Sequence, residues 1–181
     1  MRHALIALLL FQVVWLSCAI GAGYGLSWPG ICAATVAVAW HLASTTNWRR
    51  ASLIVLATGA SGLFAESLLV SAGLIRYSAA WPTDVLAPAW IVGLWLAFGT
   101  TLKSTRQLLG SHPIAKSILL GLLLGPLSYL AGQRLGALTF VARPIWPSYL
   151  AISAVWGVAY PALLVMEGRL VRPGGSRRNE E

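Results

Sequence analysis

One carboxylate, Glu66, lies within a long apolar segment of the chain, where a charged group has the strongest chemical consequences. The segment runs from Ala51 to about Ile75 and contains no other acidic residue. A carboxylate inside a hydrocarbon layer is costly unless it is protonated or paired. Two roles are therefore open for Glu66. It is either a protonation site or contact for a polar lipid or solute, or a structural hydrogen bond between helices.

The candidate partners of Glu66 lie in a later apolar segment. Counting about 1.5 Å per helical residue from Ala51 places Glu66 roughly 22 Å from the inner membrane boundary, in the outer half. On the same count Tyr129, Gln133 and Arg134 also lie in the outer half. We expect one of these three side chains to pair with Glu66.

Three more polar residues complete the candidate intramembrane site: Gln12, His41 and Tyr160. Helical spacing places Tyr160 on one side of its segment together with Ser153, Trp156 and Glu167. We expect this side, with Gln12 and His41, to line the inner half of a cavity; simple packing with one hydrogen bond each is the alternative. By the helix rise, His41 lies about 17 Å in depth from Glu66, so the two do not share a metal.

Other signatures of catalysis are missing from the sequence. It has no clustered metal ligands, nucleophile elbow, phosphate-binding loop or paired catalytic carboxylates. We therefore expect no catalytic residues, no metal and no cofactor. Cys18 and Cys32 fall at similar depth if the first two segments form a hairpin, so small apolar packing and a disulfide are both open for them.

Apolar helices must position these residues. The 181 residues are 57% hydrophobic and 10% charged, with a mean hydropathy of +0.74, whereas soluble domains carry about 25% charged residues. Six apolar segments predict an all-α polytopic membrane helix bundle with six transmembrane helices. We place them at residues 4–22, 28–44, 51–75, 89–102, 117–132 and 147–166, the fourth being short. Residues 1–168 then form a single transmembrane domain, followed by a basic, disordered cytoplasmic tail at 169–181.

The distribution of basic residues predicts the orientation. Ten of the 13 Lys and Arg residues fall on the side that carries both termini, so the positive-inside rule places the N-terminus and the C-terminus in the cytoplasm. Trp28, Trp81 and Trp146 mark the outer boundary. The net charge of +8 is spread between apolar segments and not gathered on a polar domain, which argues against nucleic acid as a partner.

Small residues recur at helical spacing in the fifth segment. They form a ribbon without bulky side chains, the feature by which helices pack closely in lipid. We expect this ribbon to lie on the central helix of the bundle and to meet the glycine-bearing face of the Glu66 segment, with Pro126 kinking the helix. The predicted packing residues are Gly121, Gly125, Ser128, Gly132 and Gly136, facing Gly59 and Gly62.

Several motifs resemble a family of small bacterial multi-span inner-membrane proteins catalogued only as a domain of unknown function. Two single positions are similar, His41 in the second segment and Glu66 in the third. The similar stretches are Leu9-Leu10-Phe11-Gln12-Val13-Val14-Trp15 in the first segment, Pro88-Ala89-Trp90 and Leu94-Trp95-Leu96-Ala97-Phe98 in the fourth, and Gly125-Pro126-Leu127-Ser128-Tyr129-Leu130-Ala131-Gly132 in the fifth. The resemblance covers about residues 5–166. It implies a multi-pass protein of the bacterial inner (plasma) membrane, and it brings an association with gene neighbourhoods for fatty-acid modification of phospholipids.

Together these observations favour a lipid-associated or accessory membrane subunit. Its expected partners are membrane lipids and another membrane protein or lipid-modifying enzyme. The alternative is a small proton-linked transporter or channel that uses Glu66 and a helix broken at Pro126. A membrane-embedded lipid-modifying enzyme is the third and least favoured hypothesis.

Overall fold

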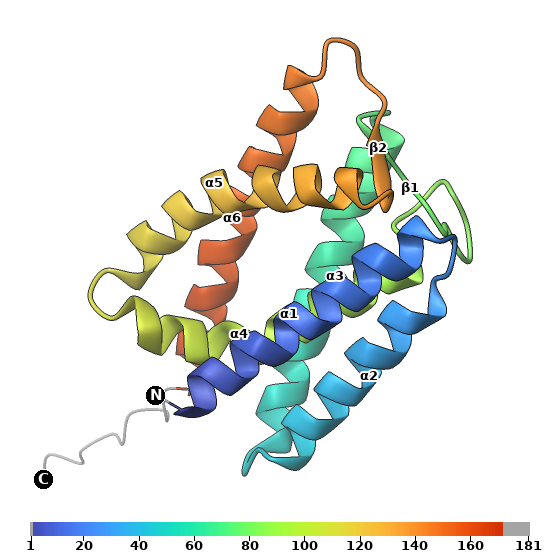
Figure 1. Ribbon diagram of the computed structural model, residues 1–181. Helices are drawn as coiled ribbons and strands as arrows, with labels where there is room; N and C mark the ends of the chain where they lie inside the picture. Colours follow the sequence, from blue (N-terminus) through green and yellow to red (C-terminus); the bar gives the residue numbers. More distant parts are fainter. Residues whose placement is uncertain (1, 172–181) are drawn as a thin grey trace, which may run out of the picture.

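The protein is all-α, as predicted, with six helices. Its structure is a computed structural model that describes residues 2–171. The helices are α1 (Arg2–Gly23), α2 (Trp28–Ala43), α3 (Trp48–Ser71), α4 (Ala89–Leu109), α5 (Pro113–Arg134) and α6 (Trp146–Val171), and two short strands, β1 (Ile75–Tyr77) and β2 (Leu138–Phe140), join them (Figure 1). The helix α6 continues into the start of the predicted tail, and residues 172–181 lie outside the described residues.

Four of the helices are long and apolar enough to cross a membrane. These are α1, α3, α5 and α6, while α2 is a shorter apolar helix. Such lengths match the roughly 20 residues that a hydrocarbon layer requires. The chain is therefore built as a membrane protein. That all six helices cross, with both termini in the cytoplasm, stays a prediction.

The helix α4 occupies the centre of the bundle. It packs against α1, α2, α3 and α6, and large side chains such as Trp90, Trp95 and Leu102 are buried on it. The prediction that the fifth segment is central was wrong. The helix itself continues beyond the predicted span end at Leu102, through a polar stretch to Leu109.

The small-residue ribbon packs on α6 and not on α3. A Cβ at Gly125 would lie 2.8 Å from Cγ of Trp156, and one at Gly121 would collide with the Trp156 carbonyl. Further along, Gly132 faces Leu138 of β2, and Ser128 donates to the carbonyl of Gly125 in its own helix. The predicted meeting of the ribbon with the α3 glycines was therefore wrong.

The α3 glycines face α4 instead. A Cβ at Gly59 would collide with Leu96, and one at Gly62 with the ring of Trp95. Large α4 side chains occupy the space that the small α3 residues leave. The two helices therefore approach closely because bulky side chains of α4 pack against glycines of α3.

The strands form a two-stranded antiparallel sheet that the sequence did not predict. Ile75 pairs with Phe140, Arg76 with Thr139 and Tyr77 with Leu138. Both strands alternate buried, exposed, buried, so the sheet turns one face towards the bundle. It holds the C-terminal ends of α3 and α5 together, beside the end of α1 (Figure 1). Gly136, at φ 79°, allows the turn from α5 into β2 and contacts Gly23.

Candidate functional site

Glu66 is buried at a junction of four elements. Its side chain is 1% exposed. The hydroxyl of Tyr77 donates to Oε2 at 2.6 Å, the indole N–H of Trp95 donates to Oε1 at 2.9 Å, and the hydroxyl of Tyr129 also donates to Oε1. A carboxylate with three donors has replaced much of the hydration it lost on burial.

Local structure brings each donor to Glu66. Gly62 lies one turn before Glu66 on α3 and leaves room for the Trp95 ring. The alternation of β1 buries Tyr77, whose ring meets Trp90 edge-on at 5.4 Å between centroids. Burial, together with the neighbouring Glu66 charge, raises the pKa of Tyr77 well above its usual value, so this hydroxyl keeps its proton and remains a donor.

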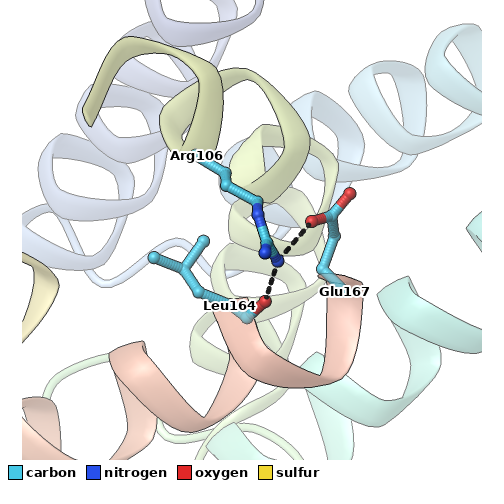
Figure 2. A network of polar contacts seen from close by, with 3 residues as sticks. All are labelled: Arg106, Leu164 and Glu167. Atoms are coloured by element: carbon cyan, nitrogen blue, oxygen red, sulfur yellow. Dashed lines mark hydrogen bonds and ion pairs between the residues drawn. The ribbon is translucent and has the colours of Figure 1, made fainter. Parts of the chain in front are cut away.

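Among the side chains of residues 5–170, no cation compensates Glu66 directly. The one ion pair within this range joins Arg106 to Glu167 at 3.5 Å. Arg106 also donates to the carbonyl of Leu164 at 2.8 Å and so ties α4 to α6 (Figure 2). Glu167, which was predicted to face the cavity, is therefore paired with Arg106. This ion pair is separate from the Glu66 junction.

A cavity of about 470 Å³ lies against the Glu66 junction, within the range of small-molecule sites. Its lining comes from all helices except α2 and from both strands. The exposed side chains Gln12 on α1 and Leu124 and Leu127 on α5 belong to this lining, so the cavity opens between these two helices. Figure 1 shows α1 and α5 apart over most of their length and converging beside the strands.

Aromatic side chains dominate the cavity wall. Nine of the 25 lining residues are aromatic, against 10% of the chain. Trp95 and Trp156 stack at 4.6 Å between centroids, and Phe98 meets Trp156 edge-on at 5.4 Å. The nine are Phe11, Trp15, Tyr77, Trp90, Trp95, Phe98, Tyr129, Trp156 and Tyr160.

The structure gathers some of the predicted site residues and separates others. Tyr129 contacts Glu66, and Gln12 and Tyr160 line the same cavity. Gln133 is half-buried in the last turn of α5, and Arg134 is exposed beside it. His41, half-buried near the end of α2, is not part of the cavity lining.

Other predicted side chains have separate local contacts. Ser153 donates to the carbonyl of Leu122 at 3.1 Å. Both cysteines are free: Cys18 is buried beside the cavity and Cys32 is exposed. Within residues 2–171, no three His, Cys, Asp or Glu side chains gather in a way that could hold a metal ion.

Sequence reasoning missed Tyr77 and Trp95, two of the three donors to Glu66. The available signal was chemical. A buried carboxylate without a cation needs O–H or N–H donors, and tyrosine and tryptophan carry one such group on an otherwise apolar body. Depth along the helices pointed to neither, since Tyr77 belongs to an unpredicted strand and Trp95 to a helix that was not expected to be central.

These features define an all-helical membrane protein in which one buried carboxylate lies at the wall of an aromatic cavity. Over residues 4–162 the chain matches the model of a family described as "Protein of unknown function (DUF2878)", and it belongs to that family. No curated protein and no solved structure matches the chain. The family description carries no activity, so the function must be argued from the site.

Proposed function

We propose that the protein binds one hydrophobic chain of a lipid-like molecule inside the membrane, as a lipid-associated accessory subunit of the bacterial inner membrane. The observation that carries this proposal is the cavity itself: it is apolar and aromatic, and it opens sideways between α1 and α5. If these helices cross the membrane, that opening faces acyl chains. A lipid could then enter without passing through water.

The length of the cavity supports a single chain. Its lining on α5 extends from Leu120 to Gly132, which is about 18 Å at 1.5 Å per residue. This is close to half of a hydrocarbon layer of about 30 Å. The cavity therefore matches the reach of a chain from one leaflet.

The helix geometry gives less support to transport. A broken helix at Pro126 was part of that hypothesis, but α5 is one continuous helix from Pro113 to Arg134. We accordingly favour binding. A partner such as another membrane protein or a lipid-modifying enzyme would receive or present the bound lipid.

The test is mass spectrometry of lipids that co-purify with the intact protein. We expect one lipid-like species per chain. Ala131→Phe should fill the cavity and remove most of this species, because Ala131 is part of its lining. Ala154→Phe, at an exposed position of α6, is the matched control and should retain it.

Two results would contradict the proposal. One is equal lipid retention by both variants, which would place the lipid outside the cavity. The other is proton-linked flux in proteoliposomes that Glu66→Gln abolishes while folding is preserved, which would favour the transporter.

A further inference from the structure

We infer that the cavity selects a cationic amphiphile, specifically one whose head is a methyl-substituted ammonium group held by aromatic rings beside Glu66. This inference rests on the proposed function and adds the chemistry of the head group. It is carried by a carboxylate that has no cationic partner among residues 5–170, together with the concentration of aromatic rings around it.

The first step is electrostatic. Glu66 accepts hydrogen bonds from three neutral groups, Tyr77, Trp95 and Tyr129. None of them carries a positive charge, and the one ion pair among residues 5–170 lies elsewhere, at Glu167. Ionised Glu66 would thus leave one negative charge uncompensated in an apolar interior, where charges interact much more strongly than in water. A bound cation would compensate it.

The second step is the route by which a ligand senses this charge. Glu66 itself is almost fully covered, but all three of its donors also line the cavity. A tyrosine that donates to a carboxylate has a more electron-rich ring. The negative charge of Glu66 therefore acts on the cavity through the ring faces of its donors. A cation within about 6 Å of a ring centroid is attracted to that ring face.

The third step concerns the kind of cation. A primary ammonium or guanidinium group needs several hydrogen-bond acceptors. Glu66 has little acceptor capacity left for such a group, because Oε1 already accepts two hydrogen bonds and Oε2 a third. A methylated ammonium has few or no N–H donors and binds through its methyl groups to aromatic faces, as in aromatic cages.

The cavity rings are also free of protein cations. Among residues 5–170, the one cation lying over an aromatic ring is Arg49 on Trp48, at 5.6 Å, and neither residue lines the cavity. The chain as a whole carries a net charge of +8, which disfavours cations at its surface. A preference for a cation would consequently have to arise inside the cavity.

The experiment compares three bromine-labelled amphiphiles that share an 11-bromoundecyl chain and differ only in the head: trimethylammonium, its uncharged tert-butyl isostere, and carboxylate. Bromine quenches tryptophan fluorescence on contact, and the intact protein in uncharged maltoside micelles supplies the signal. We expect saturable quenching by the trimethylammonium probe at a concentration about tenfold below that of the isostere.

Two variants locate the preference. Glu66→Gln should remove it, because the amide keeps hydrogen bonds but not the charge. Asp84→Asn removes the same charge from an exposed position in the β1–α4 connection and should leave the preference unchanged. Comparing the ratio between the probes in the wild-type protein with the ratio in each variant cancels their different partition into micelles.

The outcomes separate the two proposals. Equal saturable quenching by all three probes in the wild-type protein would overturn the cation preference and leave lipid binding in place; this comparison needs no variant to fold. Saturable quenching by none of them would overturn both. Retention of the preference in Glu66→Gln, or tighter binding of the carboxylate probe, would also reject the inference.

Discussion

Glu66 can remain buried because each of its three partners is a largely apolar side chain with a single hydrogen-bond donor group. Tyr77, Trp95 and Tyr129 each cover the carboxylate with a ring and donate one hydrogen bond. Lysine or arginine partners would have added their own cost of burial. Pairing with neutral donors satisfies Glu66 without adding a second buried charge.

The two stacked tryptophans allow this hydrogen bonding to be measured. Trp95→Phe removes the N–H donated to Glu66, whereas Trp156→Phe removes a buried N–H that has no partner among the described residues. Both variants lose similar ring volume from the same stack. We expect Trp95→Phe to be less stable than Trp156→Phe by about 1.5–3 kcal/mol, the value of a hydrogen bond to a charged group.

Thermal and denaturant unfolding in detergent, followed by circular dichroism, would measure this difference. Equal stability of the two variants would show that the Trp95 hydrogen bond contributes nothing. It would also indicate that Glu66 is held by the tyrosines alone.

At the scale of elements, glycines decide which helices approach each other. Gly121 and Gly125 admit α6, while Gly59 and Gly62 admit α4. The α3–α4 contact places Trp95 beside Glu66. The α5–α6 contact brings α5 against Trp156, which stacks on Trp95. The aromatic wall therefore depends on small residues of α3 and α5 that have no polar chemistry of their own.

Gly125→Leu should disrupt this arrangement. The first atom of the new side chain would already lie 2.8 Å from the Trp156 ring, and the remaining atoms have no room. We expect the free energy of unfolding to fall by about 1–3 kcal/mol or more, the cost of an overpacked core, with aggregation in detergent. Ala154→Leu adds comparable bulk at an exposed position of α6 and should behave as wild type in size-exclusion chromatography and thermal unfolding. An unchanged melting temperature for Gly125→Leu would mean that α5 and α6 can separate freely.

At the scale of the whole molecule, the paired strands close one end of the bundle and the cavity opens between α1 and α5. The distribution of basic residues predicts that the strand end lies outside the cytoplasm. Under this orientation the cavity and Glu66 lie towards the outer leaflet. The lipid bound would then come from that side.

Cysteine labelling tests the orientation. With Cys18 and Cys32 replaced by alanine, Asp84→Cys places a thiol in the exposed β1–α4 connection and Ser111→Cys places one in the exposed α4–α5 connection. A membrane-impermeant thiol reagent should label position 84 in intact cells and position 111 only after the membrane is opened. The reverse pattern would place both termini outside the cytoplasm.

The sequence by itself determined that the protein is helical and belongs in a membrane, because apolar segments of sufficient length specify this locally. It also singled out Glu66 and named Tyr129 among its partners, because a lone carboxylate in an apolar segment stands out and helix rise fixes depth. Depth gives no information on lateral neighbours. Only the tertiary structure decided that α4 is central, that the ribbon of α5 meets α6, and that Tyr77 and Trp95 complete the Glu66 junction.

The physical reason is that helix packing in lipid depends on shape. Many pairs of helices offer glycines and large apolar side chains, and hydrophobicity cannot distinguish among them. Gly62 could have packed against any bulky residue at its depth. It packs against Trp95 because the contacts of α4 with several other helices fix the position of α4. The cavity, its aromatic wall and its opening follow from that choice of neighbours, which is set by the whole chain and by no single segment.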